Sequence, residues 1–84
     1  MTQHFESARK AQQFLNALSR ITHEAISLCR KREGGWRVDA HGINQGSGDA
    51  LRLLLDGGHR ADRITEEMVV SQREFGPPDL AGQL

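Results

Sequence analysis

The chain has 84 residues, and its eleven Lys and Arg residues balance eleven Asp and Glu residues to a formal net charge of zero. With 37% hydrophobic and 26% charged residues, the composition is that of a globular protein. Zero net charge disfavours a general nucleic-acid binder, which usually has a basic excess. No apolar run approaches the roughly 18 residues of a membrane span. We therefore expect one small domain over residues 1–75 and a flexible tail over residues 76–84.

An amphipathic helix is predicted from Ser7 to about Arg20. Its apolar residues recur at steps of three and four, which places them on one helical face, and Ser7 is a suitable N-cap. The same periodicity continues as far as Cys29. It therefore leaves an alternative open, in which residues 7–32 form one long helix and the domain is mostly helical.

A β-hairpin over about residues 25–42 competes with that long helix. Residues 36–41 alternate between apolar and polar side chains, and Trp36, Val38 and Ala40 share one face of the expected strand. A buried strand needs a hydrogen-bonding partner, and the nearest one is the segment 25–31. Gly34 and Gly35 then reverse the chain. We favour the hairpin and hence an α+β fold.

A second helix is predicted over about residues 49–56, after a loop from Gly42 to Gly48. Ser47 or Asp49 is the expected cap, and the Gly57-Gly58 pair is expected to end the helix. The segment 61–75 stays ambiguous, because its spacing fits a helix while Met68-Val69-Val70 also fits a short edge strand.

The loop Gly42–Gly48 is the first candidate binding site. Glycines between a strand and a helix N-terminus can present N–H groups to an anion or to a cofactor phosphate. Gly48 is followed by Asp49 and Ala50, which does not match the Lys-Ser or Lys-Thr pair of a Walker loop. The stretch from Gly46 to Leu55 is similar to the pyrophosphate loop of acyl-CoA N-acetyltransferases, although it lacks the basic residue at its start. A flexible strand–helix connection is the simpler interpretation.

Catalytic and metal-binding residues are not predicted. The histidines at positions 4, 23, 41 and 59 are scattered, and they form no motif with the spacing of a zinc site. Cys29 needs a histidine and an electropositive pocket to act as a nucleophile. Glu66 and Glu67 are adjacent and point in different directions. We predict no enzyme, no cofactor and no metal, and the single cysteine fits a cytoplasmic location.

The chain reversal supplies the second candidate site, a possible interaction surface of four cations beside the only tryptophan: Arg30, Lys31, Arg32, Trp36 and Arg37. Trp and Arg are common in the energetically dominant parts of protein interfaces. We predict a non-enzymatic cytoplasmic protein-interaction module that binds an unidentified partner or self-associates as a homodimer, like small accessory proteins in bacteria. The alternative is nucleic-acid binding by the same hairpin tip, through phosphate contacts and base stacking.

Overall fold

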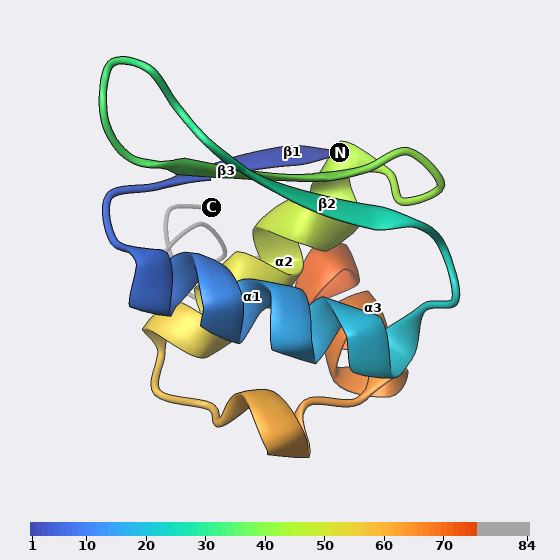
Figure 1. Cartoon of the computed structure of the whole chain (residues 1–84). Helices are drawn as coiled ribbons and strands as arrows, with labels where there is room; N and C mark the ends of the chain where they lie inside the picture. Colours follow the sequence, from blue (N-terminus) through green and yellow to red (C-terminus); the bar gives the residue numbers. More distant parts are fainter. Residues whose placement is uncertain (76–84) are drawn as a thin grey trace.

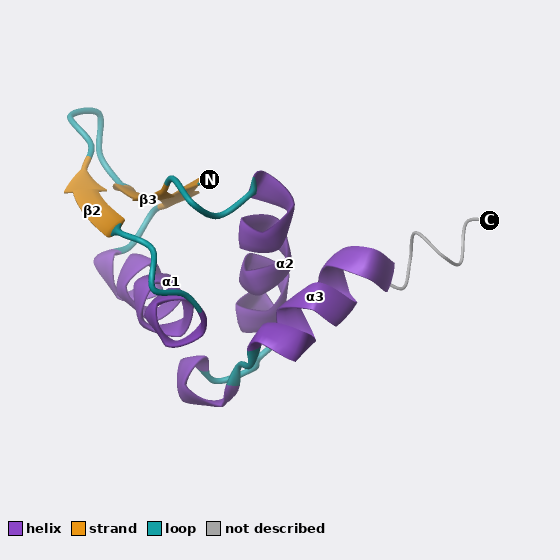
Figure 2. Ribbon diagram, turned by 90° about the vertical axis from the view of Figure 1, so that its right-hand side faces the viewer, coloured by secondary structure: helices purple, strands orange, loops and turns teal. Residues whose placement is uncertain are grey.

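A computed structural model describes residues 1–75 of the chain. The predicted tail at 76–84 lies outside the described residues. In chain order the elements are β1 (Thr2–Phe5), α1 (Ala8–Ile21), β2 (Ile26–Arg30), β3 (Trp36–Ala40), α2 (Gln45–Asp56), the 3₁₀ helix η1 (Ala61–Arg63) and α3 (Glu66–Phe75). The strands form one sheet in the order β1-β3-β2, and the helices lie on one of its faces (Figures 1 and 2). The predicted α+β fold is confirmed.

The hairpin forms as predicted, and the long helix over residues 7–32 is wrong. Helix α1 begins after its N-cap Ser7, whose Oγ accepts a hydrogen bond from Lys10 N–H at 3.1 Å, and it ends at Ile21. Strand β2 then pairs antiparallel with β3, with Leu28 opposite Val38. The helix stops at Ile21 although the apolar periodicity continues to Cys29, because β3 needs backbone partners on both sides and β2 supplies one of them. Gly34 and Gly35 reverse the chain with φ values of 102° and 88°.

Strand β1 was not predicted from the sequence. It pairs antiparallel with β3, so β1 and β2 run parallel to each other on either side of β3. This is the split β-α-β arrangement. Two of its side chains point to the helices, and one of them is polar: Gln3 is buried, and its Nε2 donates to Asp49 Oδ1 at 2.6 Å. A buried glutamine interrupts the apolar alternation that identifies a strand.

Helix α2 begins four residues earlier than predicted, because Asn44 rather than Ser47 or Asp49 is its N-cap. The Asn44 Oδ1 accepts a hydrogen bond from Ser47 N–H at 2.8 Å. Two of the predicted loop glycines therefore belong to the first turn of the helix. Gly48 is buried there, and a Cβ atom at this position would overlap the Met1 side chain. Here glycine permits close packing between β1 and α2 rather than loop flexibility.

The ambiguous segment 61–75 is helical, and the alternative of an edge strand at Met68–Val70 is wrong. After η1, the buried Ile64 leads into α3, in which Val69 is buried against α2. Figure 2 shows α3 lying beside α2, on the side away from α1. No helix within residues 1–75 is both long enough and apolar enough to cross a membrane.

The core lies between the sheet and the helices. The largest fully buried side chains come from α1, α2 and β3: Phe14, Leu18, Leu51 and Val38. Phe5 of β1 packs on Phe14 with ring centroids 5.3 Å apart. Sequestering these side chains from water is the main favourable contribution to folding, and it leaves the opposite face of the sheet exposed.

We expect Gly35→Ala to destabilise the fold more than Gly34→Ala. Both glycines have positive φ, which costs an alanine about 1–2 kcal/mol. An added Cβ at Gly35 would also lie 2.8 Å from the Phe5 carbonyl oxygen, whereas at Gly34 it would meet open space. Urea denaturation should therefore give a lower free energy of unfolding for Gly35→Ala. Equal losses in the two variants would show that the hairpin does not approach β1 as described.

Candidate interaction surface

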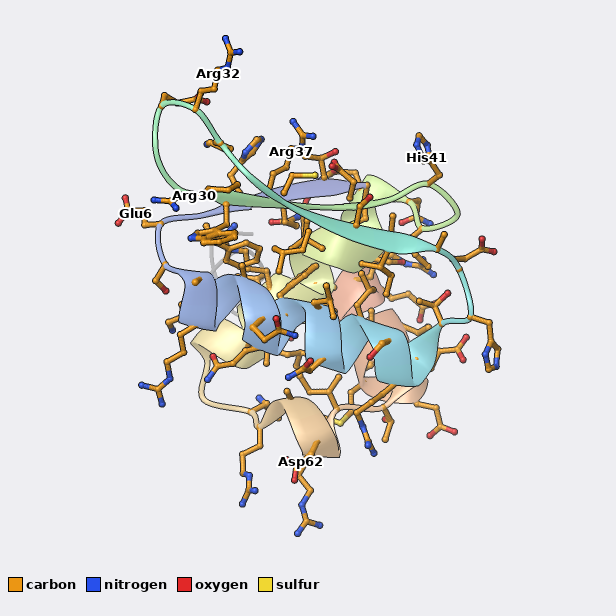
Figure 3. All side chains as sticks on the ribbon, viewed as in Figure 1. Glu6, Arg30, Arg32, Arg37, His41 and Asp62 are labelled. Atoms are coloured by element: carbon orange, nitrogen blue, oxygen red, sulfur yellow. The ribbon has the colours of Figure 1, made fainter. Side chains whose placement is uncertain are left out.

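The five predicted contact residues lie on different sides of the sheet. Figure 3 shows Arg37 pointing away from the helices, Arg32 extending from the tip of the hairpin and Arg30 on the helix side. Trp36 shares the inner face with Val38 and is partly buried against the core. The structure therefore does not gather the four cations around an exposed tryptophan.

Trp36 and Arg30 form a local pair at the end of the hairpin. They are opposite each other in the register of β2 and β3, and the Arg30 Cζ lies 5.8 Å from the centroid of the indole ring. This is within cation–π distance. The pair therefore covers the edge of the core, and part of the ring stays accessible.

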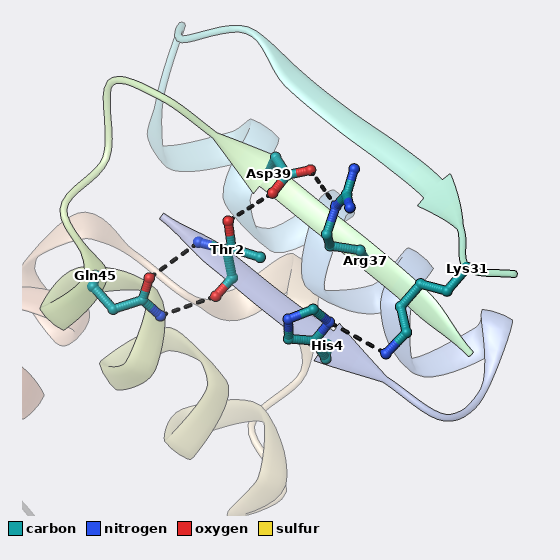
Figure 4. Close-up of polar contacts among 6 residues, drawn as sticks. All are labelled: Thr2, His4, Lys31, Arg37, Asp39 and Gln45. Atoms are coloured by element: carbon teal, nitrogen blue, oxygen red, sulfur yellow. Dashed lines mark hydrogen bonds and ion pairs between the residues drawn. The ribbon is translucent and has the colours of Figure 1, made fainter. Parts of the chain in front are cut away.

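The outer face of the sheet carries a polar network centred on Asp39 (Figure 4). Its Oδ1 accepts a hydrogen bond from Thr2 Oγ1 at 2.7 Å, and its Oδ2 pairs with Arg37 Nε at 2.7 Å. The Thr2 hydrogen bond is the main cause that lowers the pKa of Asp39, with Arg37 contributing in the same direction. The hydrogen bond and charge of Asp39 in turn raise the pKa of Arg37. The positive charge of Arg37 is thus compensated by Asp39 within the same strand.

Lys31 also has partners inside the chain. Its Nζ lies 3.4 Å from His4 Nδ1 and 3.9 Å from Glu33 Oε1. It lines a cleft of about 790 Å³ between the hairpin and the start of α1. The cleft contains further cations, but Glu6 and Asp56 line it as well. Its mixed charge indicates no particular ligand.

Arg52, which also lines this cleft, has a structural position. Its guanidinium stacks on the Phe5 ring at 4.2 Å. Its Nη1 donates to the His4 carbonyl oxygen and to Gln3 Oε1. Arg52 therefore fastens β1 to α2.

The loop Gly42–Gly48 offers few groups to an anion. The Ser47 N–H is bound to the Asn44 side chain, and the Gly48 N–H donates to the Asn44 carbonyl oxygen at 3.3 Å. Met1 packs against Gly48, and its nitrogen donates to the Ala40 and Ile43 carbonyl oxygens at 2.7 and 2.8 Å. This region joins β1 to α2 and leaves little room for a phosphate beside Gly48.

The histidine, cysteine and glutamate residues weighed for catalysis and metal binding are not gathered into one site. Cys29 lies opposite Arg37 on the outer face, and His4 occupies the same row on the other side of Arg37. Within residues 1–75, no three His, Cys, Asp or Glu side chains are grouped so that they could hold a metal ion. The Glu66 and Glu67 side chains are both exposed at the start of α3.

The β1 edge of the sheet is closed by side chains of α2, and sequence reasoning missed the residues involved. The pairing of Met1 with Ala40 fixes the alternation, so the backbone groups of Thr2 and His4 point away from β3. The Gln45 side-chain amide makes the two hydrogen bonds that a neighbouring strand would make to Thr2. Its Oε1 accepts from Thr2 N–H at 3.1 Å, and its Nε2 donates to the Thr2 carbonyl oxygen at 2.9 Å. Arg52 binds the His4 carbonyl oxygen.

The β2 edge has no such cover. The same alternation directs the backbone groups of Ser27 and Cys29 toward β3 and those of Ile26, Leu28 and Arg30 toward solvent. Among the described residues, none donates to or accepts from these outward groups of Ile26, Leu28 and Arg30. Figure 2 shows β2 at the border of the sheet with α1 beneath it and no element beyond it. This strand edge is the principal unoccupied feature of the sheet.

Comparison of the chain with protein-family models, with curated proteins and with solved structures found no match. The functional argument therefore rests on the geometry of the sheet and its edges.

We expect the Asp39 carboxyl to titrate below the ordinary aspartate pKa of about 3.9, and we expect both Thr2→Val and Arg37→Gln to raise that pKa. The ionised carboxylate stabilises the folded state above the ordinary pKa, and this contribution is lost as the pH falls through the lower folded pKa. NMR titration of the Asp39 carboxyl carbon measures the effect, with Ser27→Ala as a control beside it on β2. An unchanged Asp39 pKa in Thr2→Val would contradict the network.

Proposed function

We propose that the chain is a non-enzymatic protein-interaction module that binds an extended protein segment along the outer edge of β2. One observation carries the proposal. Gln45 and Arg52 bind the outward backbone groups of the β1 edge, whereas on the β2 edge the backbone N–H and C=O groups of Ile26, Leu28 and Arg30 face solvent. Unpaired strand edges are templates for pairing with another chain, and proteins usually block those that they do not use.

The side chains of β2 fit this role. Ile26 and Leu28 pack against the core and are only partly buried, so a strand added at this edge would cover their exposed parts. Backbone hydrogen bonds supply affinity in strand addition, and alternate side-chain contacts supply selectivity. Arg30 and the hairpin residue Arg32 are exposed and continue the edge with positive charge. An added segment with acidic residues beside the hairpin is therefore favoured.

Nucleic-acid binding by the hairpin tip remains the alternative. It is supported by the partly accessible Trp36 and by the exposed Arg32. It is disfavoured because Arg37 and Lys31 are already paired with acidic residues and because Trp36 lies on the inner face of the sheet. An RNA or DNA mobility shift that weakens steeply with salt would support this alternative.

We expect protein partners to be captured from β2 and not from β1. The photoreactive residue benzoyl-phenylalanine replaces Ser27 in one variant and His4 in another, since both side chains lie on the outer face of an edge strand and both are exposed. After irradiation in cells, mass spectrometry should find adducts at position 27 and few at position 4.

The same experiment in two backgrounds tests whether the β2 backbone is responsible. Arg30→Pro removes the outward N–H of Arg30, whereas Arg30→Ala removes the side chain and keeps that N–H. Adducts at position 27 should disappear with proline and persist with alanine. Equal capture at positions 27 and 4, or equal capture in the two backgrounds, would overturn the proposal.

A further inference from the structure

We infer that the segment added to β2 is the β2 strand of a second copy, in antiparallel register with Leu28 on the two-fold axis. This inference rests on the proposed function and names its partner. The two sheets then join into one continuous sheet in which the two β2 strands are the central pair. A two-fold interface of this kind uses the same surface on both copies.

The direction of the backbone groups selects this type of pairing. Ile26, Leu28 and Arg30 all present outward N–H and C=O groups, and they are evenly spaced along the strand. With Leu28 opposite Leu28 of the second copy, Ile26 faces Arg30 of the second copy and Arg30 faces Ile26. All three residues then make backbone hydrogen bonds, and the whole of β2 is used. Displacing the axis along the strand leaves part of β2 unpaired.

Charge complementarity supports a second copy in antiparallel orientation. Glu24 precedes β2 and Arg32 follows it, and both side chains are exposed. Antiparallel pairing brings the acidic residue before β2 in each copy toward the basic residues that end and follow β2 in the other copy. Opposite charges therefore meet at both ends of the strand pair, where they favour antiparallel over parallel association.

The surroundings of β2 leave room for a second copy. Helix α1 lies beneath the sheet and does not extend past β2 in Figure 2. The strand contains no proline, and its only charged residue is Arg30 at its end. Prolines and charged residues along a strand are common means by which proteins block an edge, and β2 has neither before Arg30. In β1, by contrast, the equivalent groups of Thr2 are bound by Gln45.

The register makes a specific prediction for disulfide formation. Ser27 and Cys29 lie on the outer face, and Cys29 is the only cysteine. With Leu28 on the axis, position 27 of one copy is opposite position 29 of the other, in a pair without mutual hydrogen bonds. Such pairs have Cα atoms about 4.5 Å apart, which suits a disulfide. Two Cys29 residues would instead be diagonal neighbours at about 7–8 Å.

The test mixes the natural chain with the double variant Ser27→Cys/Cys29→Ser, which carries a size tag, under mild oxidation. Each chain then has one cysteine, so a cross-link must join two copies. With the two chains in equal amounts, we expect a covalent heterodimer in excess over the two covalent homodimers combined on non-reducing gels. A mixture without that excess would overturn the inferred register. Covalent homodimers of the double variant in excess would do the same, because they place Ser27 on the axis.

Sedimentation equilibrium under reducing conditions tests the association without any cross-link. We expect the natural chain to dimerise, and Arg30→Pro to raise the dimer dissociation constant about tenfold or more over Arg30→Ala, because two symmetry-related hydrogen bonds are lost. Circular dichroism confirms that both variants are folded. A natural chain that stays monomeric while benzoyl-phenylalanine at position 27 captures another protein would overturn this inference and leave the proposed function standing.

Discussion

A sheet of three strands has two edges, and the backbone groups on each edge need a partner. The structure meets this requirement differently on its two sides. On β1, the Gln45 side chain binds the outward N–H and C=O of Thr2, so part of α2 takes the place of a further strand. On β2, the described residues leave the outward groups exposed. The proposed function follows from this asymmetry.

The packing of the helices explains why the asymmetry arises. Helix α2 begins at Gln45, immediately beside the start of β1, and the buried Gly48 allows the Met1 side chain to lie against it. Arg52 lies two turns after Gln45 on α2. Its guanidinium stacks on the Phe5 ring and donates a hydrogen bond to the His4 carbonyl oxygen. Helix α1 covers the inner face under β2 and β3 and contributes Phe14 and Leu18 to the core. No described helix lies where it could supply similar side chains to the β2 edge.

Much of the fold was accessible from the sequence because its signals are local. Ser7 marks the start of α1, the alternation from Trp36 to Ala40 marks β3, and Gly34-Gly35 mark the reversal. Strand β1 was missed because the buried Gln3 is polar and is satisfied by Asp49, which is distant in the sequence. The start of α2 was missed because Gly46 and Gly48 resemble a loop, whereas their role depends on packing.

The candidate site was harder to predict than the fold. The basic residues at the reversal were correctly recognised as a charged segment, but their distribution over two faces depends on strand alternation at Arg30, Trp36 and Arg37. Pairing between Arg37 and Asp39 further reduces the charge of the outer face. The unpaired edge of β2 has no sequence signal of its own, because it depends on where the helices pack. Helix α2 packs beside the opposite edge, at β1.

Amide hydrogen exchange in β2 tests the central claim most directly. In dilute solution, the Ile26, Leu28 and Arg30 amides should exchange rapidly, while those of Ser27 and Cys29 should be protected by their bonds to β3. At high concentration, the first three amides should become protected as the edge is occupied by a second copy. Protection of all five amides in dilute solution would contradict the open edge. Rapid exchange of Ile26, Leu28 and Arg30 at every concentration would contradict pairing between copies.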